Sequence, residues 1–108
     1  MLFLLQIKTY IDDECKFGHL CTDCWTDNVV RLPYITFTLR FNKKQFEMKE
    51  ILLAIKLFPH PHTAERIRSE IENVMTDFGL NSNKIEIVSD GDAATVKGIT
   101  DAGFNHIP

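Results

Sequence analysis

The sequence predicts an α/β domain built on a mixed sheet, and three observations support this. Residues 33–41 alternate apolar and polar side chains, as a strand with one face on a core does. Residues 64–78 place apolar side chains at helical spacing. A second short apolar run, residues 84–88, follows that helix. The predicted order is therefore strand, strand, strand, helix, strand, helix: an antiparallel three-strand meander, a crossover helix, a parallel fourth strand and a terminal helix.

Length and composition limit the choice of protein class. A chain of 108 residues forms one small domain, and 44% hydrophobic with 25% charged residues excludes a disordered chain. A net charge of −3 argues against general electrostatic binding of nucleic acid, so such a contact needs a local basic face. The odd number of cysteines, three, indicates a reducing compartment, the nucleus or the cytoplasm.

The first 18 residues form a segment of uncertain structure ahead of the domain predicted for residues 19–108. The start, MLFLLQI, has no basic residue before its apolar run. That run is shorter than the about 7–15 residues of a secretion signal or the about 20 of a membrane span. We expect an amphipathic strand or helix that packs on the domain, and no membrane contact.

The central part of the chain reads as a hairpin. In residues 33–41 the core face carries Ile35, Phe37, Leu39 and Phe41. Residues 42–45 are a polar break of hairpin length. Residues 46–58 then return as a longer strand that is apolar on both faces from Ile51 onward. This pattern predicts that the far end of the strand is buried on both sides, as in the centre of a sheet.

Helix signals follow this hairpin. The prolines of residues 58–63 end the strand, and Thr63 is placed to cap the next helix. Gly79 stands where a helix end favours a left-handed residue. Residues 89–91 turn the last strand into a helix that ends near Gly103, with Asp92 as its cap. The crossover helix buries Ala64, Ile67, Ile71, Val74, Met75 and Phe78 in this prediction.

Two aspartates are expected at the ends of predicted strands. Asp23 is expected at the end of a strand near residue 20, and Asp90 at the end of the last strand. Sites in open α/β sheets form outside the carboxyl ends of strands, so the two side chains converge if these strands are neighbours. Carboxylate oxygens suit Mg²⁺ or Mn²⁺, and a pair of such ions can promote phosphodiester cleavage.

Four segments resemble the ribonuclease-H-like domain of hAT-family transposases, over roughly residues 19–103. They are CTDCWTD, PYITFTLRF, LLAIKLFPHPHTAERIRSEIENVM and IEIVSDGDAATVKGI. The resemblance implies a ribonuclease-H-like fold and an ancestral metal-dependent cleavage and transfer of DNA strands. It assigns Asp23 and Asp90 as catalytic metal ligands for Mg²⁺ or Mn²⁺, Trp25 as the family tryptophan, and His62 and Thr63 as the helix-start motif.

The chain also departs from that family. Gly91 and Ala94 stand where asparagines are common, and Asp92 where a small residue is usual. The third acidic residue of the family lies far downstream, beyond a helical insertion. The resemblance therefore implies a truncated domain from a transposable element or from a host protein derived from one. We expect it to be catalytically inactive and nuclear, with residual binding of DNA or protein.

Other metal and thiol sites compete with this interpretation. Cys15, His19, Cys21 and Cys24 would complete a Cys₃His zinc set. Strand alternation, however, puts Cys21 and Cys24 on opposite faces, and a redox CxxC motif opens a helix rather than a strand. His60 and His62 form either a metal-binding pair or an ordinary loop. Asp92 is either a further ligand or a helix cap.

The alternative function is a small protein–protein interaction module. An exposed sheet edge or apolar patch would recruit a partner or a second copy. Phe104, Ile107 and residues 2–5 are the apolar residues that we expect in such a patch.

Overall fold

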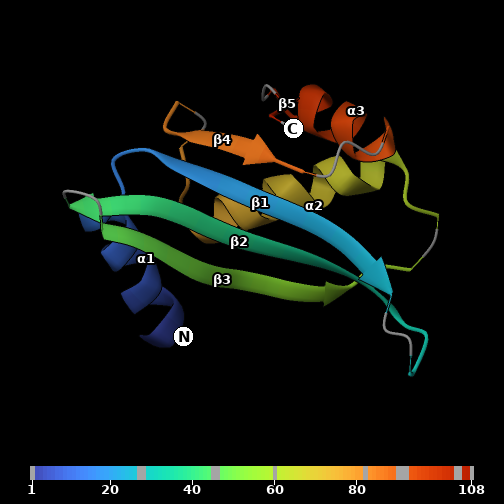
Figure 1. Ribbon diagram of the computed structural model, residues 1–108, viewed down its shortest axis with the longest axis horizontal. Coiled ribbons are helices and arrows are strands. Elements are labelled where there is room, and N and C mark those ends of the chain that lie inside the picture. Colours follow the sequence, from blue (N-terminus) through green and yellow to red (C-terminus); the bar gives the residue numbers. More distant parts are fainter. Residues whose placement is uncertain are drawn as a thin grey trace.

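The computed structural model describes residues 2–26, 29–44, 47–59, 61–81, 83–89, 93–103 and 106–107. Its elements are α1 (Leu2–Glu14), β1 (Gly18–Thr26), β2 (Pro33–Lys44), β3 (Glu47–Leu57), α2 (Ala64–Asp77), β4 (Ile85–Val88), α3 (Ala93–Asp101) and β5 (His106–Ile107). The strands form one sheet in the order β3-β2-β1-β4-β5 (Figure 1).

The strand directions confirm the predicted α/β class. β1, β2 and β3 form an antiparallel meander, and α2 then leads to β4, which pairs parallel to β1. α3 follows β4, as the terminal helix was predicted to do, and this is a ribonuclease-H-like architecture. The prediction lacked β5, which pairs parallel to β4 over two residues and is too short to leave an alternation pattern.

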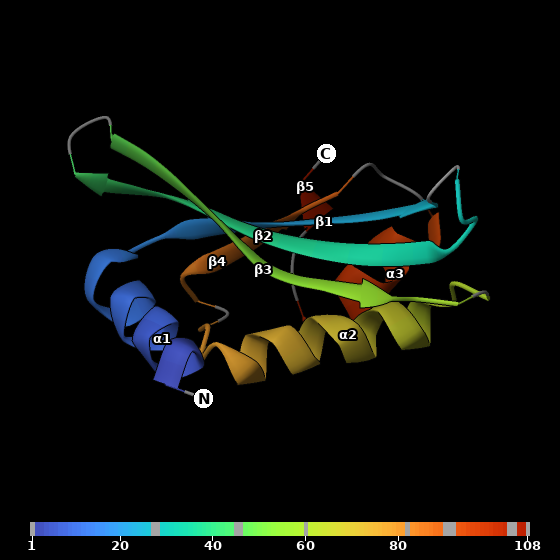
Figure 2. The same cartoon turned by 90° about the horizontal axis from the view of Figure 1, so that it is seen from below.

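All three helices lie on one side of the sheet (Figure 2). One core joins them to the sheet, with Ile11 of α1, Ile71 of α2 and Ile99 of α3 at most 3% exposed. Every second residue of β2 faces this core, namely Ile35, Phe37, Leu39 and Phe41, as the alternation predicted. No described helix covers the opposite side of the sheet, here called the open face.

A strand and a helix were both predicted as possible structures of the N-terminal segment, and the segment forms the helix. α1 buries Ile11 and, just beyond its end, Cys15. The ring of Tyr10 contacts that of Phe41, with centroids 6.2 Å apart. α1 thus closes the core at the end of the sheet where β1 begins. No helix among the described residues is long and apolar enough to cross a bilayer.

Two predictions about the hairpin were wrong. β2 continues through residues 42–44, because Asn42 and Lys44 pair with Met48 and Glu47. β3 is an edge strand, not a central one. Its two apolar faces lie in different environments. One face packs on the helices, and the other lies on the open face, where Leu52, Ile55 and Leu57 are more than half exposed.

The helix signals are confirmed for α2. The Thr63 side chain accepts a hydrogen bond from the backbone N–H of Arg66, and the helix buries Ile67, Ile71, Val74 and Met75. Gly79 follows the helix end with a left-handed φ of 62°. The predicted cap Asp92 lies outside the described residues.

Candidate functional site on the open face

Strand register arranges the side chains of the open face in rows. A shift in the β2–β3 register leaves Leu53 without a direct partner, since Phe37 lies opposite Ala54 and Thr38 opposite Leu52. The rows across β1, β2 and β3 are Trp25–Tyr34–Leu57, Asp23–Thr36–Ile55, Cys21–Thr38–Leu52 and His19–Arg40–Glu50. A polar half of the face, over β1, therefore adjoins an apolar half, over β3.

Asp23 is exposed and lies in the second row. The strand end predicted at this residue is wrong, because β1 runs on to Thr26 through its pairing with β2. Thr36 Oγ1 lies 3.5 Å from the backbone carbonyl of Asp23. Among the described residues the Asp23 carboxylate makes no ion pair.

The strand that leads to Asp90 lies beside β1. β4 pairs parallel to β1, and its last residue, Val88, is opposite Cys21. β1 and β4 are thus neighbours, which is the condition that the predicted convergence of Asp23 and Asp90 requires. Asp90 itself lies outside the described residues, so the convergence stays a prediction.

Trp25 and Tyr34 form an aromatic pair beside Asp23. Their ring centroids are 4.9 Å apart and their planes are inclined by 27°. Trp25 is 41% exposed, so the predicted motif residue is a surface side chain at the end of the open face. The pair fixes both rings at the border between the polar and the apolar half.

The cysteines are distributed over different environments. Cys21 faces the open side and Cys24 the helix side of β1, in agreement with the alternation, while Cys15 is buried in the core. Burial raises the pKa of the Cys15 thiol, against an opposing effect of Lys84. Burial also raises the pKa of Cys21, where Arg40 lowers it and Glu50 raises it further. Such thiols lack the depressed pKa of redox-active cysteines.

Within the described ranges, no three His, Cys, Asp or Glu side chains come together as metal ligands. His19 of the proposed Cys₃His set lies on the open face, 3.9 Å from Glu86. His60, the partner of His62 in the other candidate pair, lies outside the described residues.

His62 and Thr63 hold the loop between β3 and α2. His62 Nε2 donates to the Phe58 carbonyl at 2.7 Å, and the two rings stack with centroids 4.7 Å apart. Arg66 donates to the carbonyls of Pro59 and Pro61 while its guanidinium lies over the Phe58 ring. The helix-start motif therefore has a structural role in this chain.

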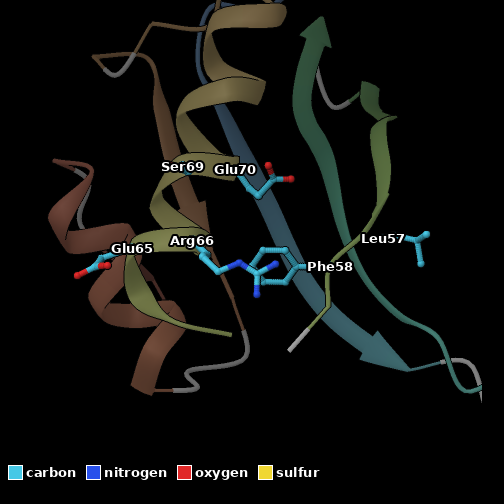
Figure 3. Close-up of a pocket in the computed structure, with 6 residues that line it drawn as sticks. All are labelled: Leu57, Phe58, Glu65, Arg66, Ser69 and Glu70. Carbon is cyan, nitrogen blue, oxygen red and sulfur yellow. The ribbon is translucent and has the colours of Figure 1, made fainter. Parts of the chain in front are cut away.

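A cavity of about 310 Å³ opens beside this loop, lined by Leu57, Phe58, Glu65, Arg66, Ser69 and Glu70. Figure 3 shows Arg66 extending across the ring of Phe58, whereas the Glu65 carboxylate points away from it. The Glu70 carboxylate is 3.8 Å from Lys56. Arg66 and Glu70 thus have partners within the chain.

Sequence reasoning missed the apolar half of the open face. It consists of Leu52, Ile55 and Leu57, which together with Trp25 are here called the open-face patch. The signal was the two-sided apolar pattern of β3, which was assigned to burial. Of the apolar residues predicted for a patch, Leu5 is 59% exposed on α1. Phe104 lies outside the described residues, as do the side chains of residues 2–4 and of Ile107.

Comparison with known proteins identifies one family over this region. A family model described as the ZBED1 RNase-like domain matches residues 21–102. The match runs from β1, with Asp23 and Trp25, through α2 and β4 to the end of α3. No curated protein matches the chain.

Proposed function

The chain belongs to the ZBED1 RNase-like domain family, and from this premise we propose that it is a ribonuclease-H-like domain derived from a hAT transposase. Its ancestral activity is metal-dependent cleavage and transfer of DNA strands. The 108-residue chain retains a weak divalent-metal site and binds nucleic acid or protein in the nucleus, without cleaving DNA. The observation that carries this proposal is the exposed carboxylate of Asp23 on a central strand of the matched region, beside the parallel strand β4.

The donor set fits a hard cation. Asp23 follows Cys21 by two residues, and Asp90 follows Val88 by two, while Cys21 and Val88 are opposite each other. This equal spacing supports a shared site for Mg²⁺ or Mn²⁺ on the two carboxylates. When bound, such an ion activates an attacking water or hydroxyl and stabilises the leaving oxygen of a phosphodiester.

Two carboxylates support binding better than catalysis. A two-metal centre holds its ions about 3.5–4 Å apart and needs several carboxylates to fix that spacing. Asp23 and Asp90 provide two. Weak metal binding without DNA cleavage is the combination expected of this pair.

A titration with Mg²⁺ and Mn²⁺, followed by amide NMR, tests the metal site. We expect shifts with Mg²⁺ and line broadening with Mn²⁺, both confined to residues around Asp23 and the end of β4 and both lost in Asp23→Asn and in Asp90→Asn. Asp12→Asn is the matched control, because Asp12 is an exposed aspartate on α1. Shifts that persist in Asp23→Asn would contradict the assignment, and metal-dependent nicking of DNA that Asp23→Asn abolishes would contradict inactivity.

A second function, protein–protein contact, is favoured by the open-face patch. Leu52, Ile55 and Leu57 are each more than half exposed and adjacent through their shared strand. Apolar patches of more than a few hundred Å² are uncommon on monomers and mark interaction sites.

A further inference from the structure

We infer that the open face is the interface between two copies of this chain, related by a two-fold axis that runs along the strands between β2 and β3. The inference rests on the second proposed function, protein–protein contact, and it specifies the partner. It does not depend on the metal site.

The exposed area of this face agrees with a dimer interface. The contributing side chains are close to half exposed or more: Trp25, Arg40, Met48, Glu50, Leu52, Ile55 and Leu57. At these fractions they supply on the order of 700 Å² per copy, close to the roughly 800 Å² per partner of a standard interface. The aromatic ring and the aliphatic side chains supply the apolar part of this area.

The charged residues of the open face would meet opposite charges on a second copy. Arg40 of β2 and Glu50 of β3 lie in one row, with Arg40 Nε 3.3 Å from Glu50 Oε2. A two-fold axis between the two strands places Arg40 of one copy over Glu50 of the second copy, and the reverse. The same operation places Tyr34 over the second copy's Leu57 and Thr36 over its Ile55. Each row thus meets its own row, with opposite charges facing each other at Arg40 and Glu50, and with the tyrosine and threonine side chains of β2 facing the apolar side chains of β3.

The edge of the sheet is a poorer candidate for the same contact. β3 is the edge strand, and pairing with a second β3 would require a regular row of backbone groups. The register shift at Leu53 interrupts that row, and an edge bulge of this kind prevents strand addition. Face-to-face packing of two sheets, about 10 Å apart, requires no free edge.

Sedimentation equilibrium of the full chain over a wide concentration range tests the inference. We expect a reversible monomer–dimer equilibrium that Leu52→Glu and Leu57→Glu weaken by about a hundredfold or more, because the two-fold axis buries each new carboxylate twice. Leu5→Glu, on the helix layer, changes a leucine of similar exposure and leaves the dissociation constant unchanged. Circular dichroism confirms that each variant is folded.

A charge exchange provides a test that does not depend on the apolar variants. Arg40→Glu and Glu50→Arg each place like charges across the axis, so each chain alone is a monomer. An equimolar mixture restores both opposite-charge contacts, and we expect it to recover the dimer. Failure to recover overturns the two-fold arrangement. A wild-type chain that stays monomeric at every concentration overturns the dimer and leaves the face to a different macromolecule. Amide shifts on Mg²⁺ addition that persist in monomeric Leu52→Glu would show that the metal site does not depend on the dimer.

Discussion

His62 and Phe58 are joined twice, by a 2.7 Å hydrogen bond from His62 Nε2 to the Phe58 carbonyl and by stacked rings 4.7 Å apart. Phe58 is 3% exposed, so the pair ties the end of β3 to the start of α2. We expect His62→Ala to lower the free energy of unfolding by about 1–2 kcal/mol, measured by urea denaturation.

His19→Ala is the control for this change. His19 is a half-exposed histidine 3.9 Å from Glu86, with its ring edge-to-face against that of the exposed Phe17, and its loss costs about 0.5 kcal/mol or less. His62→Phe retains the ring without the donor and should fall between wild type and His62→Ala. An unchanged urea midpoint for His62→Ala would show that the loop is held by other contacts.

Thr63 caps α2 by accepting the Arg66 backbone N–H at 3.3 Å. Thr63→Ala removes this acceptor and is expected to destabilise the domain by about 1 kcal/mol. Thr63→Ser keeps the hydroxyl and should retain most of the wild-type stability. Thermal and urea unfolding would measure both variants, and equal losses for Ala and Ser would exclude the cap as the cause.

Gly98 lies where α3 crosses α2. A Cβ at this position would lie 2.9 Å from the Ala64 carbonyl oxygen and 2.9 Å from Ile67 Cγ2. In an open helix Gly→Ala would gain up to about 1 kcal/mol, but overpacking of this kind costs about 1–3 kcal/mol. We therefore expect Gly98→Ala to destabilise in urea unfolding. Thr100→Ala, on the exposed side of the same helix, should have little effect, and a stabilised Gly98→Ala would show that the two helices can separate at low cost.

The raised pKa of Cys15 predicts a loss of stability at alkaline pH. Burial favours the neutral thiol, so the folded-state pKa lies above the ordinary 9.0. The stability that comes from burying the neutral Cys15 thiol is fully present below the unfolded-state pKa. It is lost as pH rises through the folded-state pKa. Urea midpoints measured from neutral pH to about pH 10 should therefore fall less steeply in Cys15→Ala than in wild type. Parallel pH dependences would contradict this.

Local patterns predicted the elements whose burial repeats along one segment. β2 alternates because every second residue, from Ile35 to Phe41, faces the helices, and α2 and its Thr63 cap were recognisable for the same reason. The first segment was left open between strand and helix because its structure depends on docking. Ile11 and Cys15 become buried because α1 docks against the end of the sheet and the rest of the core. That docking cannot be read from the first segment alone.

The position of a strand within the sheet is a tertiary property that local patterns do not contain. β3 has apolar residues on both faces, and nothing in residues 47–57 distinguishes a covering helix from solvent on the second face. The rows of the open face also depend on the register shift at Leu53, which has no signature in the sequence. Asp23 could be assigned to its strand from the sequence. That Thr36 and Ile55 lie beside it could be seen only from the strand register in the structure.

β1 is the first strand of the chain, and it lies in the middle of the sheet between β2 and β4. During synthesis β2 emerges directly after it, whereas β4 emerges only after β3 and α2. On the ribosome, one edge of β1 is therefore left without its strand partner while most of the domain is being translated. Pairing at that edge of β1 must await the synthesis of β4, more than fifty residues after β1 has ended.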